Sequence, residues 1–284
     1  MTYTAVTKAG FDSLQWSHRS STGYITGTAN LTAASTNTGS TMGRVKGALN
    51  ANITLPESTV VNILGDDTRI AVYQFDSVNP IVFEMELTVH DFAFKAATDG
   101  VDTVTESAEV MIPFGTTGGV LNGLTLLFSS KAKSQDTATL NTAGYSHVLL
   151  FNCEVVDLGS GFAHQTGNNR RYRVTANASA YLPDGRTVAS VFADVPGGTC
   201  AGLEFTSANR VTYVVFVGDN SAVNIPCTQK PVSTGTSKGT VETTGFAAAT
   251  ISSVDDTTPF NLVYSAAPGS GKFAIARHEF VNWT

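Results

Sequence analysis

The chain has 284 residues, of which 42% are hydrophobic and only 14% are charged. A chain of this length can form one large all-β domain or two ordinary domains. The formal net charge of −6 at pH 7 argues against a protein that grips nucleic acid through its phosphates, because such a surface needs clustered lysine and arginine.

No targeting or membrane signal is visible in the sequence. The first residues lack a basic segment followed by an apolar run, so we expect no secretory signal, and no stretch has the ~18 apolar residues of a spanning helix. The three cysteines, Cys153, Cys200 and Cys227, are far apart and form no C-x-x-C pair. They are typical of reduced, buried residues in a protein made in the cytoplasm.

The first part of the chain changes from a polar tract to alternating strands. Residues 1 to about 42 end in "TGTANLTAASTNTGSTMG", which indicates a polar N-terminal arm. Residues 45–55 then alternate apolar and polar positions, and so do residues 83–90, "FEMELTVH". The alternation changes phase after Asp91, which predicts a bulge or the end of a strand there.

The remaining patterns also predict strands. Apolar runs at 123–130 and 147–158 indicate buried strands, and residues 170–183 alternate again, with Arg171 and Arg173 on the polar side. No segment shows a helical period over an ordinary helix length. The fold class is therefore mostly β, with two predicted domains: residues 1–205, including the arm, and a small β-sandwich at residues 206–284.

Residue chemistry predicts no active site. The five histidines share no metal-ligand spacing, and "PGSGK" at 268–272 departs from a phosphate loop, so it is read as a turn. Glu84 and Glu86 lie about 7 Å apart on one strand face. Paired carboxylates can hydrolyse glycosides, but this pair has no sugar-stacking aromatic residue on its face. We expect no catalytic residue, no metal and no cofactor, and the chain is predicted not to be an enzyme.

Two stretches resemble a known family. The region "GALNANITLPESTVVNILGDDTRIAVYQFDSVNPIVFEMELTVHDFAFKA", continued by "LTLLFSSKAKSQDT" and "NCEVVDLGSGFAHQTGNNRRYRVTANASAYLPDG", resembles the tail-tube, or major tail, proteins of bacteriophages over roughly residues 43–190. The C-terminal piece is similar to a small immunoglobulin-like β-sandwich appended to many phage virion proteins. The long N-terminal arm and the extra C-terminal domain depart from the simplest tube subunits.

The resemblance implies a tail-tube-like β-sandwich or barrel that forms homo-oligomeric rings, commonly hexameric, in the virion tail. The rings stack into a conduit through which DNA is ejected without specific binding, and the partners are copies of the chain and the terminator, baseplate and tape-measure proteins. No membrane is involved. Pairing between subunits would cover the edges of the strands at 45–55 and 81–90.

Site residues follow from this model of a ring. Those that would face the lumen, or alternatively the solvent on the outer wall, are Glu84, Glu86, Thr88, Asn50, Asn52 and Thr54. Those that would form the core of the strands between subunits are Ile53, Leu55, Met85 and Leu87.

Three other functions remain open from sequence. The chain could be a capsid decoration or baseplate protein with a fixed small oligomeric state. It could be a carbohydrate-binding adhesive module, because residues 211–284 are rich in threonine and serine. The third is a hydrolase using Glu84 and Glu86.

Overall fold

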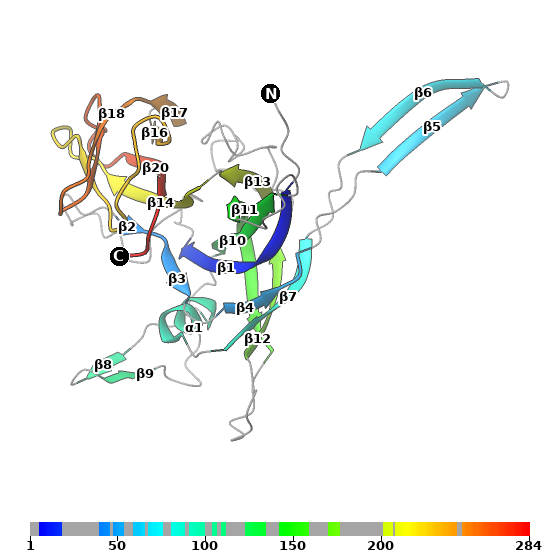
Figure 1. The fold of residues 1–284 in the computed structure, drawn as a ribbon, viewed down its shortest axis with the longest axis horizontal. Coiled ribbons are helices and arrows are strands. Elements are labelled where there is room, and N and C mark those ends of the chain that lie inside the picture. Colours follow the sequence, from blue (N-terminus) through cyan, green and yellow to red (C-terminus); the bar gives the residue numbers. More distant parts are fainter. Residues whose placement is uncertain are drawn as a thin grey trace.

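Almost every described element of the chain is a β-strand, and most of the strands form three layers (Figure 1). The computed structural model describes residues 6–18, 40–45, 48–53, 59–65, 68–75, 81–88, 91–99, 104–106, 109–111, 123–134, 142–158, 170–176, 201–206, 208–242 and 246–284. Within these ranges there is a single helix, so the prediction of a mostly β chain is confirmed.

The largest layer is an eight-stranded antiparallel sheet. Its path runs β3-β1-β10-β11-β12-β7-β4, with β13 also paired to β11. The bounds are β1 (Val6–His18), β3 (Gly43–Val45), β4 (Ala48–Ala51), β7 (Ile81–Leu87), β10 (Leu124–Ser134), β11 (Thr142–Asp157), β12 (Arg170–Ala176) and β13 (Ala201–Thr206).

This sheet curls until its two ends come together. The end strands β3 and β4 belong to one stretch of chain, so the same segment pairs with β1 through its first part and with β7 through its last part. Phe83 of β7 and Phe128 of β10 lie three strands apart along the sheet, a separation of about 14 Å if it were flat. Their ring centroids are only 5.5 Å apart. We call this layer the curled sheet.

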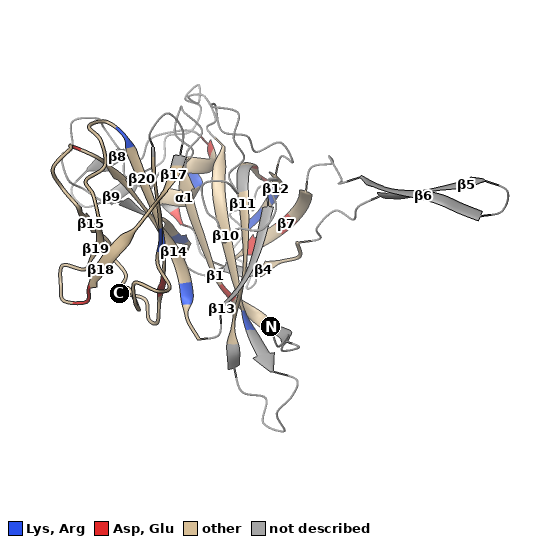
Figure 2. Cartoon of the chain, turned by 90° about the horizontal axis from the view of Figure 1, so that it is seen from above, with Lys and Arg blue, Asp and Glu red and all other residues tan. Residues whose placement is uncertain are grey.

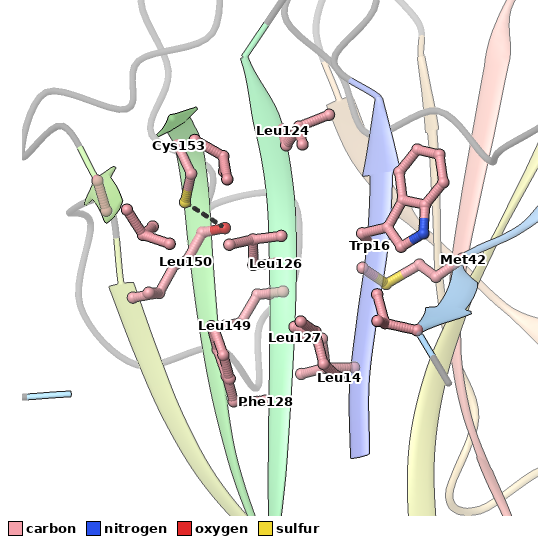
Figure 3. Packing of buried hydrophobic residues seen from close by; sticks show 14 of the residues in the cluster. Leu14, Trp16, Met42, Leu124, Leu126, Leu127, Phe128, Leu149, Leu150 and Cys153 are labelled. Carbon is pink, nitrogen blue, oxygen red and sulfur yellow. Dashed lines mark hydrogen bonds between the residues drawn. The ribbon is translucent and has the colours of Figure 1, made fainter. Parts of the chain in front are cut away.

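The inside of the curled sheet is an apolar core. Leucines of β1, β10 and β11 fill it together with Trp16 and Met42, as Figure 3 shows. Leu14, Leu126 and Leu150 are completely buried, and full burial of a leucine side chain contributes about 2 kcal/mol. Cys153 lies in this core, where its thiol contacts the carbonyl oxygen of Leu150.

A short helix, α1 (Phe92–Asp99), follows β7 and packs on this core. Asp91 caps it: its Oδ1 accepts a hydrogen bond from the backbone amide of Phe94 at 3.0 Å. Phe94 is fully buried between Trp16 and Tyr172, with ring centroids 5.8 and 5.5 Å away. The phase change after Asp91 therefore marks the end of a strand and the start of a helix, which the alternation of Phe92 and Phe94 concealed.

The second and third layers come mainly from the C-terminal part. The second is a five-stranded sheet, β17-β16-β20-β14-β2, and the third is a three-stranded sheet, β15-β19-β18. Their bounds are β2 (Ser40–Thr41), β14 (Arg210–Val217), β15 (Asn224–Pro226), β16 (Lys238–Glu242), β17 (Phe246–Ala249), β18 (Ile251–Asp255), β19 (Asn261–Tyr264) and β20 (Phe273–Phe280). A second apolar core lies between these two sheets.

Strand β14 is buried on both faces. Val211, Tyr213 and Val215 belong to the core of the curled sheet, while Val214 and Phe216 belong to the core between the second and third layers. The strand β2, from the N-terminal part, pairs with β14 as well. The domain boundary at residue 206 stays a prediction. Residues before and after it contribute to the same apolar core, and β2 and β14 belong to the same sheet.

Polar contacts add to this junction. Arg210 binds the carboxylate of Asp12 through two hydrogen bonds of 2.8 and 3.1 Å. The side-chain amide of Gln15 donates a 2.8 Å hydrogen bond to the carbonyl oxygen of Val211. Arg44 lies 4.2 Å from the centre of the Trp283 ring, which fixes the C-terminal end against β3.

Two histidines are buried: His147 on β11 of the curled sheet and His278 on β20 of the second layer. Ser129 Oγ and His147 Nδ1 are 2.8 Å apart, and His278 Nε2 lies 3.2 Å from the carbonyl oxygen of Gln229. Burial lowers the pKa of His147 to about 4, and the cation of Arg277 adds to the shift. Burial also lowers the pKa of His278 to about 4. Both side chains are therefore neutral in the folded protein at pH 7.

Two hairpins pair only with themselves among the described strands. One consists of β5 (Thr59–Gly65) and β6 (Thr68–Phe75), and the other of β8 (Val104–Glu106) and β9 (Glu109–Met111). The ribbon β5–β6 lies well apart from the three layers (Figure 1).

Replacing Asp12 with asparagine should lower the free energy of unfolding by about 3 kcal/mol, because it leaves the largely buried Arg210 without its counter-charge. Glu84→Gln is the matched control: its ion pair with Arg171 is exposed, so its loss should cost less than about 0.5 kcal/mol. Urea unfolding midpoints measure both changes. Equal losses would show that the Asp12–Arg210 contact does not hold the layers together.

Stability should fall as the pH drops from 6.5 towards 4. The folded pKa values of His147 and His278 lie below the ordinary value of 6.5, so the unfolded chain takes up protons first. Between pH 7 and pH 5 each histidine should cost about 2 kcal/mol. His147→Gln should roughly halve this slope, measured by urea unfolding at several pH values. Identical stabilities at pH 7 and pH 5 would contradict this assignment.

Candidate functional site

The exposed face of β7 carries the residues that the sequence singled out. Phe83, Met85 and Leu87 point into the core, while Glu84 and Thr88 are exposed and Glu86 is half-buried. The predicted alternation of the strand is therefore confirmed over residues 81–87.

Basic residues of β12 stand beside these glutamates. The register places Arg173 opposite Glu84 and Arg171 opposite Glu86, and Asn50 of β4 lies opposite Glu86 on the other side. Arg171 Nη1 and Glu84 Oε2 are 3.8 Å apart, with both side chains about half exposed. Acidic residues of β7 and basic residues of β12 thus occupy neighbouring strands (Figure 2). This face therefore carries both acidic and basic side chains, whereas the sequence had predicted only its two glutamates.

Apolar side chains extend the same surface. Val82 is 54% exposed and Val156 of β11 is 56% exposed, and the register places both on the side of the glutamates. Glu154 of β11 is exposed as well. We call this surface the β7–β12 face: Val82, Glu84, Glu86, Arg171, Arg173, Glu154 and Val156. Single exposed valines are common on protein surfaces, so they do not by themselves assign a partner to this face.

The remaining predicted residues divide into three groups. Asn50 and Asn52 are exposed, as predicted for polar positions of this segment, whereas Thr54 and Leu55 lie outside the described residues. Ile53 packs partly buried against the core of the curled sheet.

Met85 and Leu87 are each only 1% exposed. They are buried within one chain, where a contact between subunits was expected, because α1 and the curled sheet enclose them. The backbone edges are paired within the chain too, since β7 lies between β12 and β4. Both edges of β7 are therefore covered without a neighbouring subunit, and β4 pairs with β7 along one of its edges.

The ribbon β5–β6 is a second candidate surface, which sequence reasoning had not assigned to any role. Its register places Val61 opposite Tyr73 and Ile63 opposite Ala71. The signal was present in the sequence: the Gly-Asp-Asp turn at 65–67 separates two runs rich in β-branched residues.

The loop at 268–272 is held by its own hydrogen bonds. The amide of Gly271 donates to Gly218 O, and the amide of Ser270 donates to Asn220 Oδ1. The amide of Lys272 donates to Gly269 O. A phosphate loop needs such amides to point at the ligand, so this geometry favours the structural turn predicted from sequence.

No cluster of three potential metal ligands occurs among the described residues. Ser129 and His147 are in contact, but each is only 1% exposed, so a substrate has no access to the pair. No helix in the described part of the chain is long and apolar enough to cross a membrane.

Comparison with known proteins assigns the chain to no group: no protein-family model, no curated protein and no solved structure matches it.

Proposed function

We propose that the chain is a structural subunit that binds copies of itself and assembles into stacked rings, as the resemblance to phage tail-tube proteins implies. The observation that carries the proposal is the ribbon β5–β6, which lies apart from the layers and pairs with no other described strand.

Physical chemistry gives the ribbon a reason to bind something. An isolated two-stranded hairpin is at best marginally stable in water and needs a further strand or an apolar surface against it. Both of its outer strand edges carry backbone groups without a partner strand among the described residues, and such edges favour pairing with another chain.

The composition of the ribbon supports the same proposal. Its two strands contain one charged residue, Arg69, among fifteen residues. A ribbon like this on every copy supplies a projecting arm that reaches a neighbouring subunit. A heterologous contact of this kind closes into a ring or continues as a tube.

In this proposal the curled sheet with α1 is the tail-tube-like domain, and the immunoglobulin-like sandwich of the second and third layers projects outward from the ring. Rings would be hexameric and part of the virion tail, in contact with terminator, baseplate and tape-measure proteins. The β7–β12 face lines either the lumen or the outer wall. Because Glu84 and Glu86 offset Arg171 and Arg173, the face offers DNA no net positive charge to hold it.

The experiment is negative-stain electron microscopy of the purified chain over a range of concentrations. The wild type should form hollow rings or stacked tubes. Val61→Asp should abolish them, because a carboxylate in the contact between subunits would be buried without a partner at a cost of several kcal/mol. Asn62→Asp is the matched control, because it places the same charge on the next residue of β5, and successive residues of a strand alternate between its two faces.

Circular dichroism and thermal unfolding should show that both variants remain folded, since the ribbon lies outside the layers. Rings formed equally well by Val61→Asp would rule out the ribbon as the assembly contact. Fixed trimers that never stack would favour a decoration or baseplate protein instead, and saturable binding on a glycan array would favour an adhesive module.

A further inference from the structure

The junction between the curled sheet and the second layer is partly polar. Leu14 of β1 packs in the apolar core inside the curled sheet. Its alternating neighbours Ser13, Gln15 and Ser17 lie on the opposite side of the strand, where each is at most 2% exposed. Gln15 donates to the carbonyl oxygen of Val211 in β14, so this outer side of the curled sheet faces the second layer.

Three oxygen atoms of β1 are buried in the junction without a hydrogen-bond partner among the described residues: Ser13 Oγ, Gln15 Oε1 and Ser17 Oγ. Such atoms lose their hydration without gaining a hydrogen bond, which makes the closed junction less stable. Separation of the two surfaces would return water to all three. Backbone pairing across the junction is also short, since among the described strands only the two-residue strand β2 joins β14 to the N-terminal part.

Apolar contacts oppose this separation. Leu127 and Leu149 occupy the same outer side of the curled sheet as Gln15, because the register places these three residues beside one another. They belong to one buried cluster with Tyr213 and Ile275 of the second layer. The junction thus combines apolar attraction with uncompensated polar groups, a balance that one added charge can shift.

His147 lies at the polar part of this junction. The register places Ser13 beside Ser129 and Ser129 beside His147 on the outer side of the curled sheet. Ser129 Oγ lies 2.8 Å from His147 Nδ1. The imidazole also hydrogen-bonds to the backbone of Asn209, the residue before β14. A histidine of the curled sheet is therefore bonded across the junction to the segment that enters the second layer.

Protonation of His147 is unfavourable while the junction is closed. Burial is the largest cause that lowers its pKa to about 4, and the cation of Arg277 on β20 adds to the shift. Arg210 of β14 acts in the same direction and Asp12 of β1 in the opposite one. In water the ring titrates near its ordinary pKa of 6.5. Between these two values, acid therefore favours an open junction with a protonated ring over the closed one.

Carboxylates of the surrounding strands are already engaged with arginines. Asp12 accepts two hydrogen bonds from Arg210. Glu279 of β20 accepts one hydrogen bond from Arg277. Glu204 of β13 occupies the register position opposite His147.

We propose that the junction is an acid-sensitive contact: protonation of His147 opens it, and the second and third layers separate from the curled sheet while the inside of that sheet and the core of the sandwich stay packed. At neutral pH the junction is closed and the layers form one body. The open form binds one proton more than the closed form, so the opening constant should rise about twentyfold between pH 7 and pH 5. This property belongs to a single chain and does not rest on assembly into rings.

Thiol labelling of the native, full-length chain measures the opening. Ser13→Cys places a thiol of nearly the same shape in the junction, and Ser13 Oγ has no hydrogen bond with a described residue to lose. A pyridyl disulfide reagent reacts with thiols by disulfide exchange, and it reaches this thiol only when the junction opens. The labelling rate, divided by the rate of the denatured chain at the same pH, should rise about twentyfold from pH 7 to pH 5.

Two natural cysteines separate opening of the junction from unfolding. Cys153 is buried in the core of the curled sheet and Cys227 in the core of the sandwich. Mass spectrometry of peptides assigns each label to its residue. The thiol introduced by Ser13→Cys should react faster than both at every pH, relative to the denatured chain. Equal relative rates would show that the junction opens only when the chain unfolds, and the proposal would be overturned.

His147→Gln, made in the Ser13→Cys chain, should remove the rise towards pH 5, because glutamine does not titrate. His278→Gln is the matched control. His278 is also buried with a pKa of about 4, but it lies on the face of β20 turned away from the junction. This control should keep the full rise. Ser17→Cys is a second probe and should show the same pH dependence as Ser13→Cys. Labelling that is independent of pH, or a rise lost equally in both histidine variants, would contradict the proposal.

Discussion

The structure depends on one strand, β14, which is buried on both faces. Its odd-numbered residues Val211, Tyr213 and Val215 complete the core under the curled sheet. Its even-numbered residues Val214 and Phe216 complete the core of the sandwich. Without β14 both cores would expose apolar surface to water, and each fully buried valine or phenylalanine contributes roughly 1.5 to 3 kcal/mol. The N-terminal and C-terminal parts are therefore joined by packing as well as by the chain.

The polar contacts at the junction serve a different purpose from this apolar packing. Apolar packing is non-directional and allows two sheets to slide, whereas the two hydrogen bonds between Arg210 and Asp12 and the bond from Gln15 to Val211 O fix one orientation. In the proposed assembly a fixed orientation would matter, because a sandwich that turned freely would obstruct regular stacking.

Much of the fold could be predicted because alternation and apolar runs are local signals. The strands predicted at 83–90, 123–130 and 147–158 overlap the observed strands at 81–87, 124–134 and 142–157. The helix α1 was missed because Phe92 and Phe94 alternate like strand residues, and its main signal was a single capping aspartate, Asp91. Closure of the curled sheet was also out of reach, since it depends on one segment changing its partner from β1 to β7.

The candidate site was predictable only in part, because the pairing of distant strands leaves no local signal in the sequence. The sequence placed Glu84 and Glu86 on a polar face, and it placed Arg171 and Arg173 on another, but only the pairing of β7 with β12 brings the two sets together. Likewise, residues 206–284 were predicted to form a separate sandwich, and no local pattern reveals that one face of β14 packs on the curled sheet.

Native-state hydrogen exchange of the intact chain, resolved for single strands, tests the central claim that β14 makes these layers one body. If β14 is shared by both cores, its amides should exchange only through the same high-energy opening as those of β10 in the curled sheet. If β14 instead exchanged together with β18 and β19 at a clearly lower free energy while β10 stayed protected, the sandwich would open as an independent unit and the account would be contradicted.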